Sequence, residues 1–120
     1  MFAHDIHVAL AWTAAVAMAA IAIEAGVRTV RRREPARLAE AGLALAVGLI
    51  GMTSAAGLAM LVRGERPTEW LHFLYAILAF GLVPVADSLA AHVPPRAKGL
   101  ARLGGALVAL GVIARLFATG

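Results

Sequence analysis

Two of the four histidines have surroundings suited to a shared metal site. His7 and His72 are each followed by alanine at the i+4 and i+7 positions, so the pattern His-xxx-Ala-xx-Ala occurs twice. In a helix these offsets lie on one face, and each imidazole would border a shallow groove of small side chains. Neutral imidazole is a common ligand of protein-bound metals. The small residues of the two grooves are Ala11, Ala14, Ala76 and Ala79.

Four apolar segments carry these histidines. The 120-residue chain is 62% hydrophobic and only 15% charged, with a mean hydropathy of +0.85, whereas a soluble domain has about a quarter of its residues charged. The segments match a hydrocarbon layer of about 30 Å at about 1.5 Å per helical residue. The sequence therefore predicts an all-α, integral membrane protein with a single four-span domain over residues 1–120. The predicted spans are 6–27, 38–62, 70–91 and 103–118.

The connections between the spans predict both topology and orientation. The segments 31–35, 63–67 and 93–96 are short and contain proline, so each span should return antiparallel to the one before, giving an up-down four-helix bundle. The first and third connections and their flanks hold eight of the eleven basic residues, which places them in the cytoplasm and both chain termini outside. A bacterial inner (plasma) membrane is the expected location. This asymmetry accounts for the basic charge, and no nucleic-acid partner is expected.

The predicted topology brings the two histidines to one depth. The spans of His7 and His72 run in the same direction, so both imidazoles should lie near the outer face. Two such imidazoles can supply both axial ligands of one haem iron. His4, one turn before His7, is a reserve ligand. The outer arginines, which could pair with haem propionates, are Arg63, Arg66 and Arg115.

Other interpretations of these residues stay open. A copper or zinc ion could be held by His4, Asp5, His7 and His72, or the histidines could have no cofactor. His92 is about 30 Å from His72 along the third span and belongs to another site. The absence of cysteine excludes iron–sulfur clusters and covalent haem attachment on this chain.

Polar and irregular residues elsewhere in the spans yield further predictions. Glu24, Glu40 and Asp87 have similar inner depths, where they could form a proton path or ion site, or pair with the nearby basic residues. Pro84 predicts a bend near Phe80. Close helix contacts are expected along two rows of small residues, which are Gly51, Ala55 and Ala59 in the second span and Ala101, Gly105 and Ala109 in the fourth.

Three short motifs resemble one half of the heme A synthase family. They are residues 6–11 (IHVALA), 48–53 (GLIGMT) and 71–76 (LHFLYA). The resemblance implies a four-helix membrane unit with haem held by His7 and His72. The chain departs from the family because His4 stands where a glutamate is common, and because the cysteine pair and the second half are absent. The resemblance therefore implies haem binding more strongly than haem hydroxylation.

Together these features predict a small membrane b-type cytochrome with one haem b. Its expected role is electron transfer with a quinol (the quinone pool), or within a larger respiratory or photosynthetic membrane complex. Membrane lipid is an expected partner, and a homodimer could rebuild an eight-helix unit. Two alternatives are a cofactor-free accessory subunit that docks through its glycine and alanine faces, and an enzyme that modifies haem. Electron transfer or haem binding is expected rather than catalysis.

Overall fold

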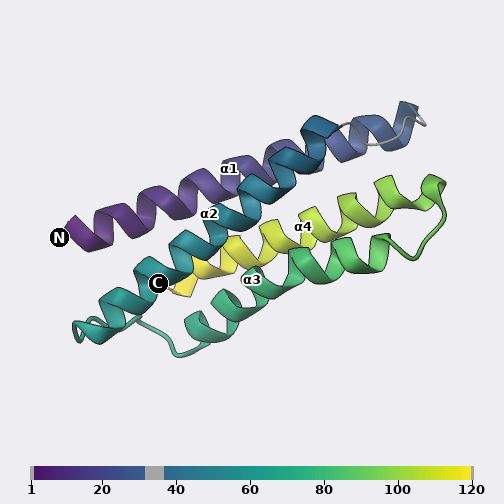
Figure 1. Cartoon of the computed structure of the whole chain (residues 1–120). Coiled ribbons are helices and arrows are strands. Elements are labelled where there is room, and N and C mark those ends of the chain that lie inside the picture. The colour runs from purple at the N-terminus through teal and green to yellow at the C-terminus, as the bar shows by residue number, and fades with distance from the viewer. Residues whose placement is uncertain (1, 32–36, 120) are drawn as a thin grey trace.

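The computed structural model describes residues 2–31 and 37–119 of the chain, and they form four helices. These are α1 (Phe2–Arg31), α2 (Arg37–Val62), α3 (Leu71–Ala90) and α4 (Pro95–Thr119). Consecutive helices run in opposite directions, which confirms the predicted up-down order (Figure 1). All four are long and apolar enough to cross a membrane. Phe2 and Thr119 mark the end that we call the terminal end, and the starts of α2 and α4 mark the opposite, charged end.

Each helix of the bundle packs against two neighbours and lies diagonally opposite the third helix. α1 packs against α2 and α4, and α3 packs against α4, whereas α2 and α3 meet over a smaller area. α1 and α3 therefore lie on one diagonal of the bundle, with α2 and α4 on the other. His7 on α1 and His72 on α3 approach each other across the interior, at the terminal end.

The helix boundaries differ from the predicted spans chiefly at the charged end. α4 begins at Pro95, where the prediction placed the start of the span at Leu103. Proline fits the first turn of a helix because the amide there has no intrahelical partner, and the alanine, lysine and arginine that follow are good helix formers. α1 likewise continues to Arg31. α3 remains helical through Pro84. The whole connection between α1 and α2, residues 32–36, lies outside the described residues.

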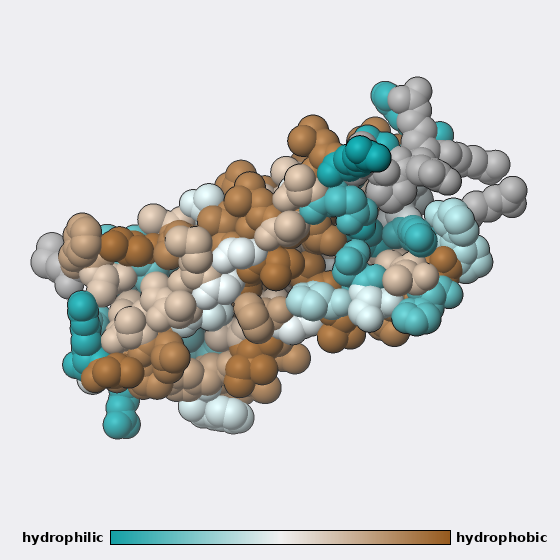
Figure 2. All heavy atoms as spheres, in the orientation of Figure 1, coloured by the Kyte–Doolittle hydropathy of each residue, from teal (hydrophilic) through white to brown (hydrophobic). Residues whose placement is uncertain are grey.

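The interior is narrow and the exterior is apolar. Met18, Ala46 and Ala109 are completely buried and form a central layer of the core. Trp12 and Ile77, in contrast, expose 59% and 71% of their surface. Figure 2 shows this distribution on one face, where a largely apolar band lies between hydrophilic residues at the two ends. Such an exterior suits lipid rather than water, because lipid imposes no cost on exposed hydrocarbon side chains.

Small residues allow the helices to approach closely. A Cβ atom at Gly105 would lie only 2.7 Å from the Cβ atom of Ala86, so the contact between α4 and α3 requires glycine at this position. Gly51 of α2 also lies at a helix contact, but a Cβ atom there would lie 3.4 Å from the Phe80 ring of α3, about an ordinary van der Waals distance. Both glycines belong to the rows of small residues expected from the sequence. In the second-span row, however, Ala55 and Ala59 are exposed, so the expected close contact does not continue along α2.

We expect Gly105→Ala to destabilise the bundle, because the added methyl group would force α3 and α4 apart. Overpacking of this kind costs about 1–3 kcal/mol. Gly104→Ala is the matched control, since the neighbouring glycine has open space around it and alanine favours the helix by about 0.5–1 kcal/mol. Thermal unfolding in detergent, followed by circular dichroism, measures both. Equal melting temperatures for the two variants would contradict the close contact.

Candidate functional site

A cavity of about 390 Å³ lies between the four helices at the terminal end. Its volume falls within the range of about 300–1,000 Å³ that is usual for small-molecule sites. Most of its wall is apolar, and each helix contributes to it. The lining residues are His4, His7, Val8, Ala11 and Ala14 of α1, Ile50, Thr53 and Ser54 of α2, His72, Ala76 and Ala79 of α3, and Ile113, Leu116 and Phe117 of α4.

His7 and His72 form a pair at this cavity. Their ring centres are 6.2 Å apart and their planes are inclined by 53°. Two imidazoles that bind one metal ion from opposite sides, through bonds of about 2 Å, place their ring centres about 6 Å apart, because each ring centre lies about 1 Å behind its nitrogen. The separation of the two rings is therefore compatible with a single ion between them.

A helix carbonyl determines which nitrogen of His7 is available. The Nδ1 atom of His7 lies 3.0 Å from the backbone carbonyl oxygen of Thr53 on α2. A carbonyl only accepts hydrogen bonds, so the neutral imidazole carries its proton on Nδ1 and has a free lone pair on Nε2. Gly57 provides room for this contact, because a Cβ atom there would lie 3.2 Å from the Cε1 atom of His7.

His72 is oriented by the last turn of α4. Its Nδ1 atom lies 3.5 Å from the hydroxyl oxygen of Thr119, a long contact with a buried residue. The Thr119 hydroxyl donates its own proton to the Arg115 carbonyl at 3.0 Å, so it presents a lone pair to His72. The Glu69 amide donates to the Thr119 carbonyl at 3.3 Å and ties the connection before α3 to this turn. Nδ1 engaged by the protein and Nε2 left free is the usual arrangement of a metal-binding histidine.

The other residues predicted for the site fall into two groups. All four alanines of the repeated pattern line the cavity together with the histidines, and so does the reserve ligand His4. The three predicted arginines do not line it. Arg63 and Arg66 are exposed at the connection between α2 and α3, whereas the Arg115 guanidinium carbon lies 5.9 Å from the centre of the Tyr75 ring. Within the described ranges, no three His, Asp or Glu side chains converge as a metal-binding group.

Three residues that orient the histidines were not predicted as part of the site. Thr53 and Gly57 are one turn apart on the same face of α2. A histidine ring that contacts the Thr53 carbonyl therefore lies beside residue 57, which must be small. That spacing is visible in the sequence, but many small-residue pairs in this chain share it. Thr119 has no local signal, because its role depends on the end of α4 lying beside the start of α3.

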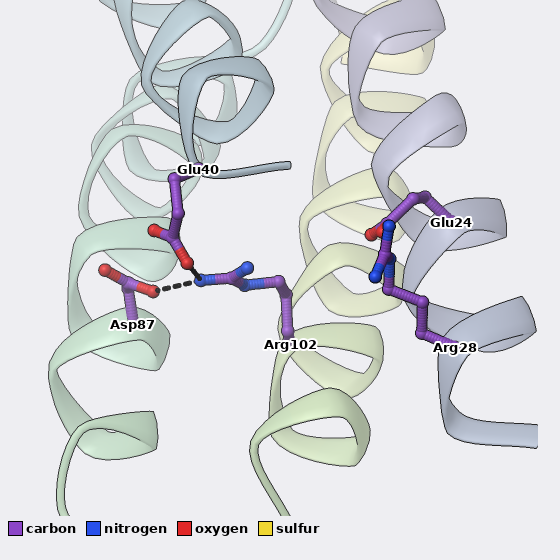
Figure 3. A network of polar contacts seen from close by, with 5 residues as sticks. All are labelled: Glu24, Arg28, Glu40, Asp87 and Arg102. Atoms are coloured by element: carbon purple, nitrogen blue, oxygen red, sulfur yellow. Dashed lines mark hydrogen bonds and ion pairs between the residues drawn. The ribbon is translucent and has the colours of Figure 1, made fainter. Parts of the chain in front are cut away.

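The carboxylates at the charged end are occupied by ion pairs (Figure 3). The Nη2 atom of Arg102 lies 2.7 Å from Glu40 Oε1 and 3.2 Å from Asp87 Oδ1, joining α4 to α2 and α3. Glu24 pairs with Arg28 within α1. Of the alternatives considered for these carboxylates, which were a proton path, an ion site and pairing with basic residues, the structure shows pairing with basic residues. The buried layer around Met18 separates this end from the histidine cavity.

No protein-family model matches this chain, and no curated protein or solved structure is significantly similar to it. Its function is therefore inferred from the residues of the cavity.

We expect neutral His7 to be the Nδ1–H tautomer, because the Thr53 carbonyl accepts its proton. Nitrogen-15 NMR of histidine-labelled protein in detergent distinguishes the two tautomers by the shift of the unprotonated nitrogen. Gly57→Ala should displace the ring and mix the tautomers, whereas Gly48→Ala, on the same helix with nothing within 4 Å, should leave the spectrum unchanged. A predominant Nε2–H form in the unmodified protein would contradict this orientation.

Proposed function

We propose that this chain is a small membrane b-type cytochrome that holds one haem b between His7 and His72. The observation that supports it most is the histidine pair itself. The two rings are 6.2 Å apart, both Nδ1 atoms have partners on a different helix, and the pair borders a cavity of about 390 Å³. Both Nε2 atoms are then available to one iron.

The number of donors favours haem over a bare metal ion. A porphyrin supplies four nitrogens of its own, so the protein needs to add only two axial ligands. Zinc sites use three or four protein ligands, and the described residues contain no group of three. Copper or zinc held by His4, Asp5, His7 and His72 is accordingly the weaker proposal.

The cavity wall also suits a flat, apolar macrocycle. Ala11 and Ala14 on one side, with Ala76 and Ala79 on the other, leave space beside each histidine because their side chains end at Cβ. Arg63, Arg66 and Arg115 remain the proposed partners of the propionates, since they belong to the helix ends and connection at this end. Their guanidinium groups can pair with carboxylates in two parallel hydrogen bonds.

Electron transfer is the activity that this ligand set supports best. A haem iron with two histidine ligands supplies one-electron redox chemistry and has no open position for oxygen. No carboxylate belongs to the described part of the cavity wall, which favours electron transfer over the haem modification implied by the resemblance to half of heme A synthase. We assign the role to exchange with a quinol or a larger membrane complex. The terminal end would face outward from a bacterial inner membrane, since the basic residues concentrate at the charged end.

His7→Ala and His72→Ala should each abolish the haem b spectrum, because each removes one axial ligand. His92→Ala is the matched control, since His92, in the turn after α3, contacts the Ser88 carbonyl of that helix and does not line the cavity. Reduced-minus-oxidised absorption spectra of protein expressed with ample haem and purified in detergent measure the effect.

Unmodified protein without haem bands under these conditions would overturn the cytochrome proposal and favour the cofactor-free accessory subunit. Haem bands that persist unchanged in His72→Ala would instead exclude the proposed ligand pair. His4→Ala should leave the haem bands in place. Loss of the bands in His4→Ala would indicate that His4, and not His7, is the ligand on α1.

Ala76→Leu should reduce haem content severalfold, because the larger side chain would occupy space beside His72. Ala55→Leu is the matched control, as Ala55 is exposed on α2 and does not line the cavity. The haem-to-protein ratio, from pyridine haemochrome absorbance and amino-acid analysis, compares the two. Equal haem content would show that the alanine groove is not the binding surface.

A further inference from the structure

A second cavity lies at the charged end, remote from the histidine pair. Its volume is about 380 Å³, and its wall combines charged side chains from three helices. Glu40 comes from α2, Asp87 from α3, and Lys98 and Arg102 from α4. Ala90, Ala91 and Pro95 complete the wall with small, apolar surface. The cavity is therefore built between helix ends, where hydrophilic residues concentrate (Figure 2).

The cavity wall has two acidic and two basic side chains, but not all of them are fully paired with one another. Arg102 is 11% exposed and uses one nitrogen for both carboxylates, through Glu40 Oε1 and Asp87 Oδ1. The second oxygen of each carboxylate makes no ion pair within the described part of the chain, and these side chains are 57% and 47% exposed. Lys98 lines the same cavity. It has no ion-pair partner among the described residues.

These charges select for a ligand that carries both signs. A simple anion would be repelled by Glu40 and Asp87, and a simple cation by Lys98 and Arg102. A zwitterion can satisfy both, with its anionic group beside Lys98 and its cationic group beside the free carboxylate oxygens. The first turn of α4, which begins at Pro95, adds the positive potential of a helix N-terminus on the Lys98 side.

We propose that this cavity binds a phosphoethanolamine headgroup, supplied by a phosphatidylethanolamine lipid. The proposal rests on the membrane location included in the proposed function, which would place the ends of α2, α3 and α4 at headgroup depth. The phosphate contacts Lys98 and the start of α4. The primary ammonium donates hydrogen bonds to Glu40 and Asp87, adding to the link that Arg102 makes between the helices.

Three lipids with the same acyl chains test the headgroup chemistry. Native mass spectrometry of the detergent-purified full chain measures retention of phosphatidylethanolamine, phosphatidylcholine and phosphatidylglycerol. Phosphatidylcholine has a cation without N–H donors, and phosphatidylglycerol has no cation. We expect phosphatidylethanolamine to be retained about tenfold more than either, the scale of a charge-assisted hydrogen bond. Equal retention of the three lipids would overturn the proposal.

A charge variant and its matched control test whether the lipid binds in this cavity. Lys98→Met should reduce phosphatidylethanolamine retention severalfold, and Lys98→Arg should largely restore it. Arg31→Met removes a positive charge at the same end, from an exposed position on α1 that is not part of the cavity wall. An equal loss in Arg31→Met and Lys98→Met would indicate general surface attraction and contradict a specific site.

Two further measurements separate the possible failures. Inorganic phosphate, added to the same samples, should displace little lipid; displacement at equal concentration would favour a free-phosphate site and overturn the lipid assignment. Haem spectra of the same samples report on the other cavity. Lipid selectivity without haem bands counts against the cytochrome alone, and haem bands without lipid selectivity count against the headgroup site alone.

Discussion

The structure depends on how closely its helices approach one another. The four helices are long and apolar enough to span a membrane. Lipid provides no hydrophobic driving force between helices, so in a membrane their association would rely on side-chain packing and on a few polar contacts. Gly105 meets this requirement where α4 crosses Ala86 of α3. Small side chains have a different effect at the terminal end. There the alanines on α1 and α3 are too short to reach one another, and a cavity remains between them. Small residues thus provide both the tight contacts and the open site.

The bundle has two chemically different ends separated by a buried layer. At the terminal end, imidazoles border an apolar space, and the partners that orient them are backbone or hydroxyl groups. At the charged end, ion pairs join three helices around Arg102. Met18, Ala46 and Ala109 fill the interior between them. This separation allows the proposed haem site and the proposed headgroup site to be changed and measured independently.

The orientation of the histidines illustrates how the helices cooperate. His7 belongs to α1, but the carbonyl that determines its tautomer belongs to α2, and the glycine that provides its space is also on α2. His72 belongs to α3, and its partner Thr119 is in the last turn of α4. Each member of the pair is therefore held by a neighbouring helix, which restricts the rings before any ligand is present and lowers the entropy lost on binding.

Composition and spacing were sufficient to predict four apolar helices in up-down order, because span length and short connections constrain the topology strongly. They also brought His7 and His72 to one depth, since helical rise relates sequence position directly to height. Helix ends were harder to predict: α4 begins at Pro95 because proline can start a helix as well as stop one. The partners Thr53, Gly57 and Thr119, and the sharing of Arg102 between Glu40 and Asp87, were decided only by the tertiary structure. Such contacts depend on the rotation and separation of the helices, which the packing of all four settles together.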